Sequence, residues 1–216
     1  MLREDAVWPP RVGGGGVAYK ASAWRFYVLF VLSVFSCMQC ACWFVFSSVD
    51  PSIVKRYMGS AVPNDAAIGL LLNWGPIVGV AFAPLQMRLG AEASGLRRSV
   101  VAGAWLVFLG SALRCAPVLA APGARGKWWS AGCLHLGQVL NAAAGPLCMG
   151  TVSRLSARWF PEDERLFATA VGSMANALGV VVMYPLAPAI CADAPQLPRL
   201  LLATAQRQRC DVGIAH

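Results

Sequence analysis

The sequence predicts an all-α membrane protein, and three features support this prediction. Hydrophobic residues make up 57% of the 216 residues and charged residues only 13%, whereas soluble domains carry about a quarter charged residues. The apolar residues gather into five runs, each close to the ~20 residues that a helix needs to cross a bilayer. The charged residues gather between these runs, as they do when the helices lie in lipid.

The five predicted spans cover residues 26–48, 66–87, 99–119, 129–153 and 167–189. Residues 1–24 hold prolines, a glycine run and charges of both signs, and we expect them to be a disordered cytosolic N-terminus. Residues 25–190 form the predicted membrane domain. Residues 50–65 are expected to be a polar loop, because Pro51 and Pro63 break regular structure.

The orientation follows from the basic residues, which are retained on the cytosolic side. The N-terminal segment and the links predicted to lie on the same side of the membrane hold ten basic residues. The links on the opposite side hold four. The first set is Arg3, Arg11, Lys20, Arg25, Arg88, Arg97, Arg98, Arg154, Arg158 and Arg165; the second is Lys55, Arg56, Arg125 and Lys127. The N-terminus is therefore predicted to lie in the cytosol.

Residues 191–216 break the pattern, because a leucine-rich patch near Leu200 is too short to cross a membrane and the rest is polar. We interpret them as an unpatterned tail, from a chain that is truncated or read out of frame.

Several function classes are set aside. The net charge of +8 does not form a basic stripe with interleaved aromatic residues, so nucleic-acid binding is not expected. Cys37 and Cys40 have a redox-like or zinc-like spacing, but inside a predicted span they are interpreted as packing residues. The spans hold no paired carboxylates and no histidine cluster, so we expect neither enzymatic activity nor a metal or cofactor.

Two glycine-rich faces are predicted to pack closely against neighbouring helices. Gly137, Asn141 and Gly145 recur every four residues in the fourth span, and Gly172, Asn176 and Gly179 recur similarly in the fifth. Small residues at such spacing let helix backbones approach one another.

The chain resembles solute carrier family 49 of the major facilitator superfamily over about residues 24–189. The link at Gly90, Glu92, Gly95, Arg97 and Arg98 approximates the superfamily's loop motif, with Glu92 at a position that is usually Asp. The strings that carry the resemblance are LNWGPI from Leu72, LRCAP from Leu113, HLGQVLNAAAGP from His135 and WFPEDERLFATA from Trp159.

The resemblance implies the first five helices of a twelve-helix transporter fold, an incomplete six-helix half. It implies transport of a small organic solute, pyridoxine-like or choline-like, by alternating access and linked to protons. It also implies a lysosomal membrane, with the plasma membrane as the alternative because no lysosomal sorting signal is seen. A second reading is a non-transporting fragment that associates with, or interferes with, a full-length transporter or a C-terminal half.

Trp43, Gln138 and Asn141 are the predicted solute contacts. A tryptophan face attracts a cationic or flat heteroaromatic solute, and the two amides offer both donors and acceptors. Interhelical hydrogen bonding is the alternative role for both amides, which with His135 are predicted to share one helical face. Trp43 is otherwise a lipid-facing or interfacial residue.

His135 and Arg114 are the two titratable candidates within the spans. His135 is a candidate proton carrier because its side chain titrates near neutral pH. Arg114 lies near the end of its span, where it either snorkels to the interface or lines the entrance to the cavity.

A cytosolic gate is predicted from the charged links. Glu164 is expected to pair with Arg97 or Arg98, with Glu92 and Arg165 nearby. Pairs that form in only one state would stabilise that state during alternating access.

Overall fold

The computed structural model describes residues 23–58, 65–91, 95–120, 128–192 and 196–205, and these residues form helices without any strand. The labelled helices are α1 (Trp24–Ser48), α2 (Pro51–Met58), α3 (Asp65–Ala91), α4 (Gly95–Ala120), α5 (Trp128–Trp159) and α6 (Arg165–Ile190), with a 3-10 turn η3 (Glu162–Glu164) before α6. The all-α prediction is confirmed for the described part of the chain. Each of the five predicted spans lies within one long helix.

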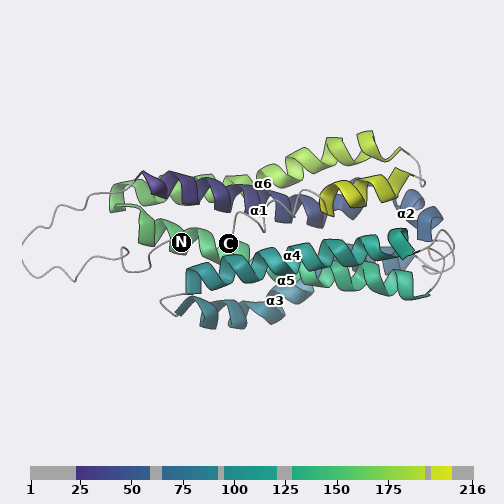
Figure 1. The fold of residues 1–216 in the computed structure, drawn as a ribbon, viewed down its shortest axis with the longest axis horizontal. Helices are drawn as coiled ribbons and strands as arrows, with labels where there is room; N and C mark the ends of the chain where they lie inside the picture. Colours follow the sequence, from purple (N-terminus) through teal and green to yellow (C-terminus); the bar gives the residue numbers. More distant parts are fainter. Residues whose placement is uncertain (1–22, 59–64, 92–94, 121–127, 193–195, 206–216) are drawn as a thin grey trace, which may run out of the picture.

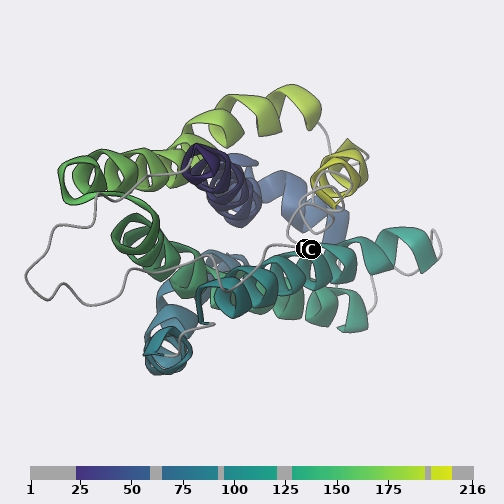
Figure 2. The same ribbon diagram turned by 60° about the vertical axis from the view of Figure 1, so that its left-hand side comes forward.

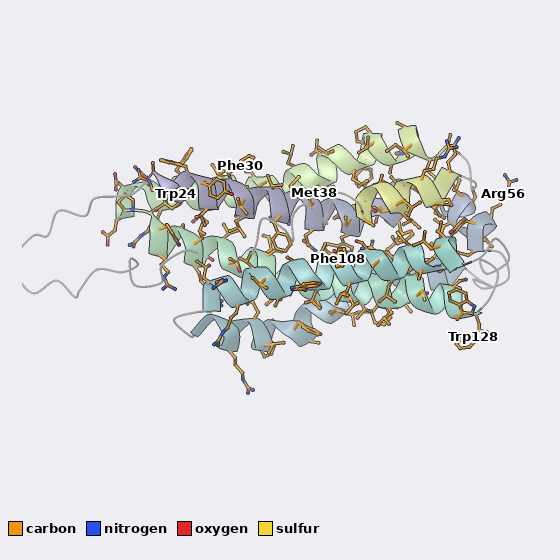
Figure 3. The ribbon with its side chains drawn as sticks, viewed as in Figure 1. Trp24, Phe30, Met38, Arg56, Phe108 and Trp128 are labelled. Atoms are coloured by element: carbon orange, nitrogen blue, oxygen red, sulfur yellow. The ribbon has the colours of Figure 1, made fainter. Side chains whose placement is uncertain are left out.

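The long helices run side by side in two groups (Figure 1). One group pairs α1 with α6, and the other contains α3, α4 and α5, as the turned view also shows (Figure 2). Helix α5 joins the two groups, because it packs against α4 and α3 on one side and against α1 and α6 on the other. Trp24 marks one end of the bundle, and Trp128 and Arg56 mark the other (Figure 3).

Four of the described helices, α1, α3, α4 and α6, are long and apolar enough to cross a membrane. Helix α5 is also long enough, at 32 residues, but it carries more polar and small residues. Protein surrounds much of α5, so its side chains are less exposed to lipid and need less apolar surface. The predicted count of five spans therefore remains a prediction, with α5 as the helix in question.

The predicted loop over residues 50–65 is wrong for its first part, which forms α2. Pro51 occupies the first helical position, where its missing N–H costs nothing. Asp50 precedes it, and its carboxylate accepts a hydrogen bond from the Ser52 N–H at 2.7 Å. Hydrogen bonds from the Ser52 side chain and backbone lower the pKa of Asp50. A proline read as a breaker thus begins a helix.

Two apolar clusters lie toward opposite ends of the bundle. One gathers Leu29 and Leu32 of α1 with Leu155 of α5, near the end that Trp24 marks. The other gathers Phe46 of α1 with Met58 of α2. The segments of α1, α4 and α5 between the two clusters carry buried polar side chains.

The interpretation of residues 191–216 as unpatterned is wrong for residues 197–205, which form a helix. Leu197, Leu200 and Leu201 are buried in the same cluster as Phe46. The Cys115 thiol of α4 donates a hydrogen bond to the Leu201 carbonyl at 3.3 Å. A leucine patch too short to cross a bilayer is long enough to cover the end of the bundle. Residues 206–216 lie outside the described residues, as do residues 1–22.

Glycines set close helix contacts, which confirms the predicted packing faces at Gly137, Gly172 and Gly179, whereas a Cβ on Gly145 would make only an ordinary contact with Gln39 at 3.7 Å. A Cβ added to Gly137 of α5 would lie 2.5 Å from the Gly110 carbonyl of α4. A Cβ added to Gly172 of α6 would lie 2.7 Å from a Val152 methyl of α5. At Gly179 of α6 it would overlap the Cys37 carbonyl of α1. These approaches require the absence of a side chain.

Replacing Gly179 with alanine is expected to destabilise the chain by about 1–3 kcal/mol, because the added methyl group has no space between α6 and α1. Thermal unfolding in detergent measures this loss. Gly79→Ala is the matched control, since a Cβ there meets nothing within 4 Å. Equal unfolding temperatures for the two variants would contradict the packing described here.

Candidate functional site: a polar layer between helices

The centre of the bundle contains a pair of reciprocal hydrogen bonds between α1 and α5. The Gln39 amide donates to the Asn141 backbone carbonyl at 3.2 Å, and the Asn141 amide donates to the Gln39 backbone carbonyl at 3.4 Å. Both side chains are buried. The Asn141 Oδ1 atom has no hydrogen-bond partner among the described residues, so it remains an unused acceptor.

Gln138 lies one turn before Asn141 and is fully buried. Its Nε2 atom donates to the Trp43 backbone carbonyl at 3.1 Å, and its Oε1 atom accepts from Arg114 at 3.3 Å. Gln138 therefore links α1, α4 and α5. This arrangement matches the interhelical role that the sequence left open for both amides.

Arg114 does not reach the membrane interface, so the predicted snorkelling is wrong. Its side chain is 2% exposed, and it points inward from α4 to the Cys42 backbone carbonyl of α1 at 2.8 Å. Further bonds run to the Gly110 carbonyl at 3.3 Å and the Ser111 hydroxyl at 3.5 Å. The guanidinium has enough donors to satisfy these acceptors from within the bundle.

Trp43 is half-buried and its indole ring lies against Gly75 of α3. A Cβ added to Gly75 would overlap the six-membered part of that ring. Phe44 packs beside it, with ring centroids 5.4 Å apart. The ring therefore lies against protein on one side and is not a freely exposed interfacial tryptophan. Gly75 provides the space that the ring occupies.

His135 contacts a different helix from the two amides. The Trp74 indole N–H of α3 donates to His135 Nδ1 at 3.0 Å, so the proton of the neutral imidazole is assigned to Nε2. The predicted common face for His135, Gln138 and Asn141 is wrong in this respect. Residues six positions apart on a 3.6-residue helix are turned by about 120° from each other, and α5 lies between α3 and α1.

The charged links have different partners from those predicted. Glu164 forms an ion pair with Arg25 at the start of α1, at 2.9 Å, instead of the expected pair with Arg97 or Arg98. Both of those arginines are exposed. Arg165 donates to the Phe160 carbonyl at 3.2 Å and lies 3.8 Å from Glu162. Glu92 lies outside the described residues.

Four residues were not found from the sequence: Gln39, Trp74 and Gly75 in and beside the polar layer, and Arg25 at the start of α1. Gln39 had a usable signal, because an amide in the middle of an apolar run needs a partner inside the protein. Trp74 and Gly75 had none beyond their place in a family string. Arg25 was counted only as a positive flanking residue. In the described ranges, no group of three or more His, Cys, Asp or Glu side chains could hold a metal ion.

Comparisons with known proteins identify relatives of this chain. The chain is 33% identical over 189 residues to the solute carrier family 49 member 4 homolog of Xenopus tropicalis, an alignment that covers 87% of this chain. It is a homologue of solute carrier family 49. The chain is also 26% identical over 206 residues to solute carrier family 49 member A3 of Xenopus tropicalis. No protein-family model matches it.

A third relative has a name that states what it transports. The mouse choline/ethanolamine transporter FLVCR1 is 28% identical over 169 residues, which cover 77% of this chain and 27% of the relative. This chain spans about two fifths of the member 4 homolog, because the alignment covers 38% of that relative's length. These proteins are transporters and solute carriers, and the described helices are those of a multi-pass membrane protein.

Removing the Arg25–Glu164 pair is expected to cost about 0.5–1 kcal/mol of stability, a small value because the Glu164 side chain is 34% exposed and partly solvated. A double-mutant cycle with Arg25→Met and Glu164→Gln, read by thermal unfolding at low and high salt, measures this coupling. Glu162→Gln is the matched control, since the Glu162 side chain is 91% exposed. A coupling energy of zero at low salt would contradict the ion pair.

Proposed function

We propose that the full-length protein to which this chain belongs transports a small organic solute across a membrane by alternating access. The observation that supports this most directly is the layer of buried polar side chains between apolar helices. Such groups are costly in lipid and mark solute pathways in membrane proteins. Relatives of this chain are named as solute carriers, and one as a choline/ethanolamine transporter.

Trp43, Gln138 and Asn141 are the proposed solute contacts. The exposed side of the Trp43 ring would hold a choline-like cation or a pyridoxine-like ring, a contact worth about 0.5–2 kcal/mol. Asn141 Oδ1 is an unused acceptor, and Gln138 retains one amide hydrogen beyond its bond to Trp43. Small movements of α1 against α5 would bring these groups to a bound solute.

Proton linkage is proposed to act through His135. The bond from Trp74 requires Nδ1 of the imidazole to be unprotonated. When His135 takes up a second proton, this acceptor is lost and α5 is released from α3 at that point. A charge change at His135 would thus become a change in helix contact, which alternating access needs.

The charged links are proposed as the gate on the cytosolic side. Glu164 with Arg25 joins the turn before α6 to α1, while Glu92, Arg97, Arg98 and Arg165 remain proposed members. We place the protein in the lysosomal membrane, with the plasma membrane as the alternative. The second candidate function is that of a non-transporting chain that associates with, or interferes with, a full-length transporter or a C-terminal half.

Replacing Trp43 with alanine is expected to raise KM for the transported probe by about 2- to 30-fold, because the aromatic face is lost. Uptake of labelled pyridoxine and of labelled choline into vesicles measures this in the full-length protein. Trp105→Ala is the matched control, since Trp105 is 42% exposed on α4. Uptake of neither probe by the wild type would reject the proposed solute classes, and uptake by this chain alone would exclude the fragment function.

Replacing His135 with glutamine is expected to remove the dependence of uptake on an imposed proton gradient, because glutamine cannot change its charge. The rate of uptake at several values of external pH measures this. Trp74→Phe is the companion variant: it keeps the imidazole but removes the indole donor, so the pH dependence should be retained with a changed midpoint. An unchanged pH profile in His135→Gln would remove the histidine from the mechanism.

A further inference from the structure

Arg114 is a buried cation without a carboxylate on the helices that surround it. None of α1, α4 and α5 contains Asp or Glu, and the guanidinium is closed off from solvent. Buried charges are strongly unfavourable unless dipoles or opposite charges meet them. Here the dipoles come from two backbone carbonyls, one hydroxyl and one amide, at 2.8–3.5 Å.

The position of Arg114 determines which way the Gln138 amide points. Because Arg114 Nη1 is a donor, it faces the Oε1 atom of Gln138 and leaves the Nε2 atom to face Trp43. The opposite orientation would place two donors against each other and a carbonyl oxygen against the Trp43 carbonyl. One arginine thus selects one of the two amide orientations.

Two neighbouring carbonyls of α1 are held from outside the helix by this arrangement. Arg114 donates to the Cys42 carbonyl at 2.8 Å, and Gln138 donates to the Trp43 carbonyl at 3.1 Å. The Trp43 ring extends from the same turn toward Gly75 of α3. The backbone that carries the ring is therefore anchored on the side of α4 and α5.

The Arg114 side chain crosses the close contact between α4 and α5 at Gly137. A Cβ on Gly137 would lie 2.7 Å from Arg114 Cγ, so only glycine leaves space for the arginine to pass across α5. Gly110, one turn before Arg114, makes the matching close approach on α4. The two glycines and the arginine form one packing unit.

We propose that Arg114 is a positioning residue: through Gln138 and the Cys42 carbonyl it sets the place of Trp43 in the centre of the bundle. Arg114 does not touch the solute. Its effect on solute affinity rests on the proposed function of Trp43 and Gln138, whereas its effect on the Trp43 ring concerns this chain alone. The two effects are therefore measured separately.

The experiment uses the whole chain in detergent with 5-fluorotryptophan at its eight tryptophans, and Trp43→Phe identifies the ¹⁹F resonance of Trp43. Arg114→Met is expected to shift or broaden that resonance, and Arg114→Lys is expected to retain much of the original position because lysine still donates to carbonyl oxygens. Leu134→Ala is the matched control: it removes a buried core side chain from α5 and should lower the unfolding temperature without moving the resonance.

Gln138→Glu keeps the test decisive if Arg114→Met does not fold. Glutamate neutralises Arg114 but has no N–H for the Trp43 carbonyl, so the chain should stay folded while the Trp43 resonance moves. Binding of labelled pyridoxine and choline is measured in parallel on the full-length protein and its matching variants. Loss of a hydrogen bond to a charged group predicts an affinity about tenfold weaker in Arg114→Met.

The outcomes separate the two proposals. A Trp43 resonance that stays at its wild-type position in Arg114→Met or in Gln138→Glu overturns the positioning role. A shifted resonance, together with no binding of either probe by the wild type, supports the positioning role and counts against the proposed function. A shifted resonance with affinities that equal those of Leu134→Ala restricts the role of Arg114 to the ring and overturns its effect on the solute.

Discussion

The structure depends on one constraint: a polar group between apolar helices needs a partner inside the protein. Asparagine, glutamine and arginine side chains of α4 and α5 in the central layer meet this need with backbone carbonyls of α1. Each carbonyl oxygen has two lone pairs, so it can accept a side-chain bond in addition to its bond within the helix. Helix α1 can therefore serve as the common acceptor for α4 and α5 without unwinding.

The same constraint explains the order of layers along the bundle. Apolar clusters lie toward the two ends, and the buried polar side chains lie between them. Asn176 of α6 adds to the layer by donating to the Ser36 carbonyl of α1 at 3.2 Å. Four helices thus exchange hydrogen bonds along the stretch of α1 from Ser36 to Trp43. The apolar clusters hold the helices together, and the polar layer fixes their register.

Much of this fold could be predicted from the sequence, and the site only in part. The long helices follow from runs of apolar residues, because a helix that faces lipid needs an apolar surface. The glycine faces follow from the spacing of the glycines along the sequence. Helix α2 and the helix at residues 197–205 could not be found this way, since their formation depends on a proline at a helix start and on leucines covered by neighbouring helices. The partners of Gln138, Arg114 and His135 depend on which helices are neighbours, and that is set by packing across the whole bundle.

The unusual composition of α5 has a consequence for how the chain is assembled. A helix that carries Gln138, Asn141 and His135 gains little by entering lipid alone, because these groups would have no partners there. The α1 carbonyls, the Trp74 indole of α3 and the Arg114 guanidinium of α4 that satisfy them belong to helices made earlier. During synthesis, α5 should therefore remain beside the insertion machinery until those helices are available, and enter the bilayer as their companion.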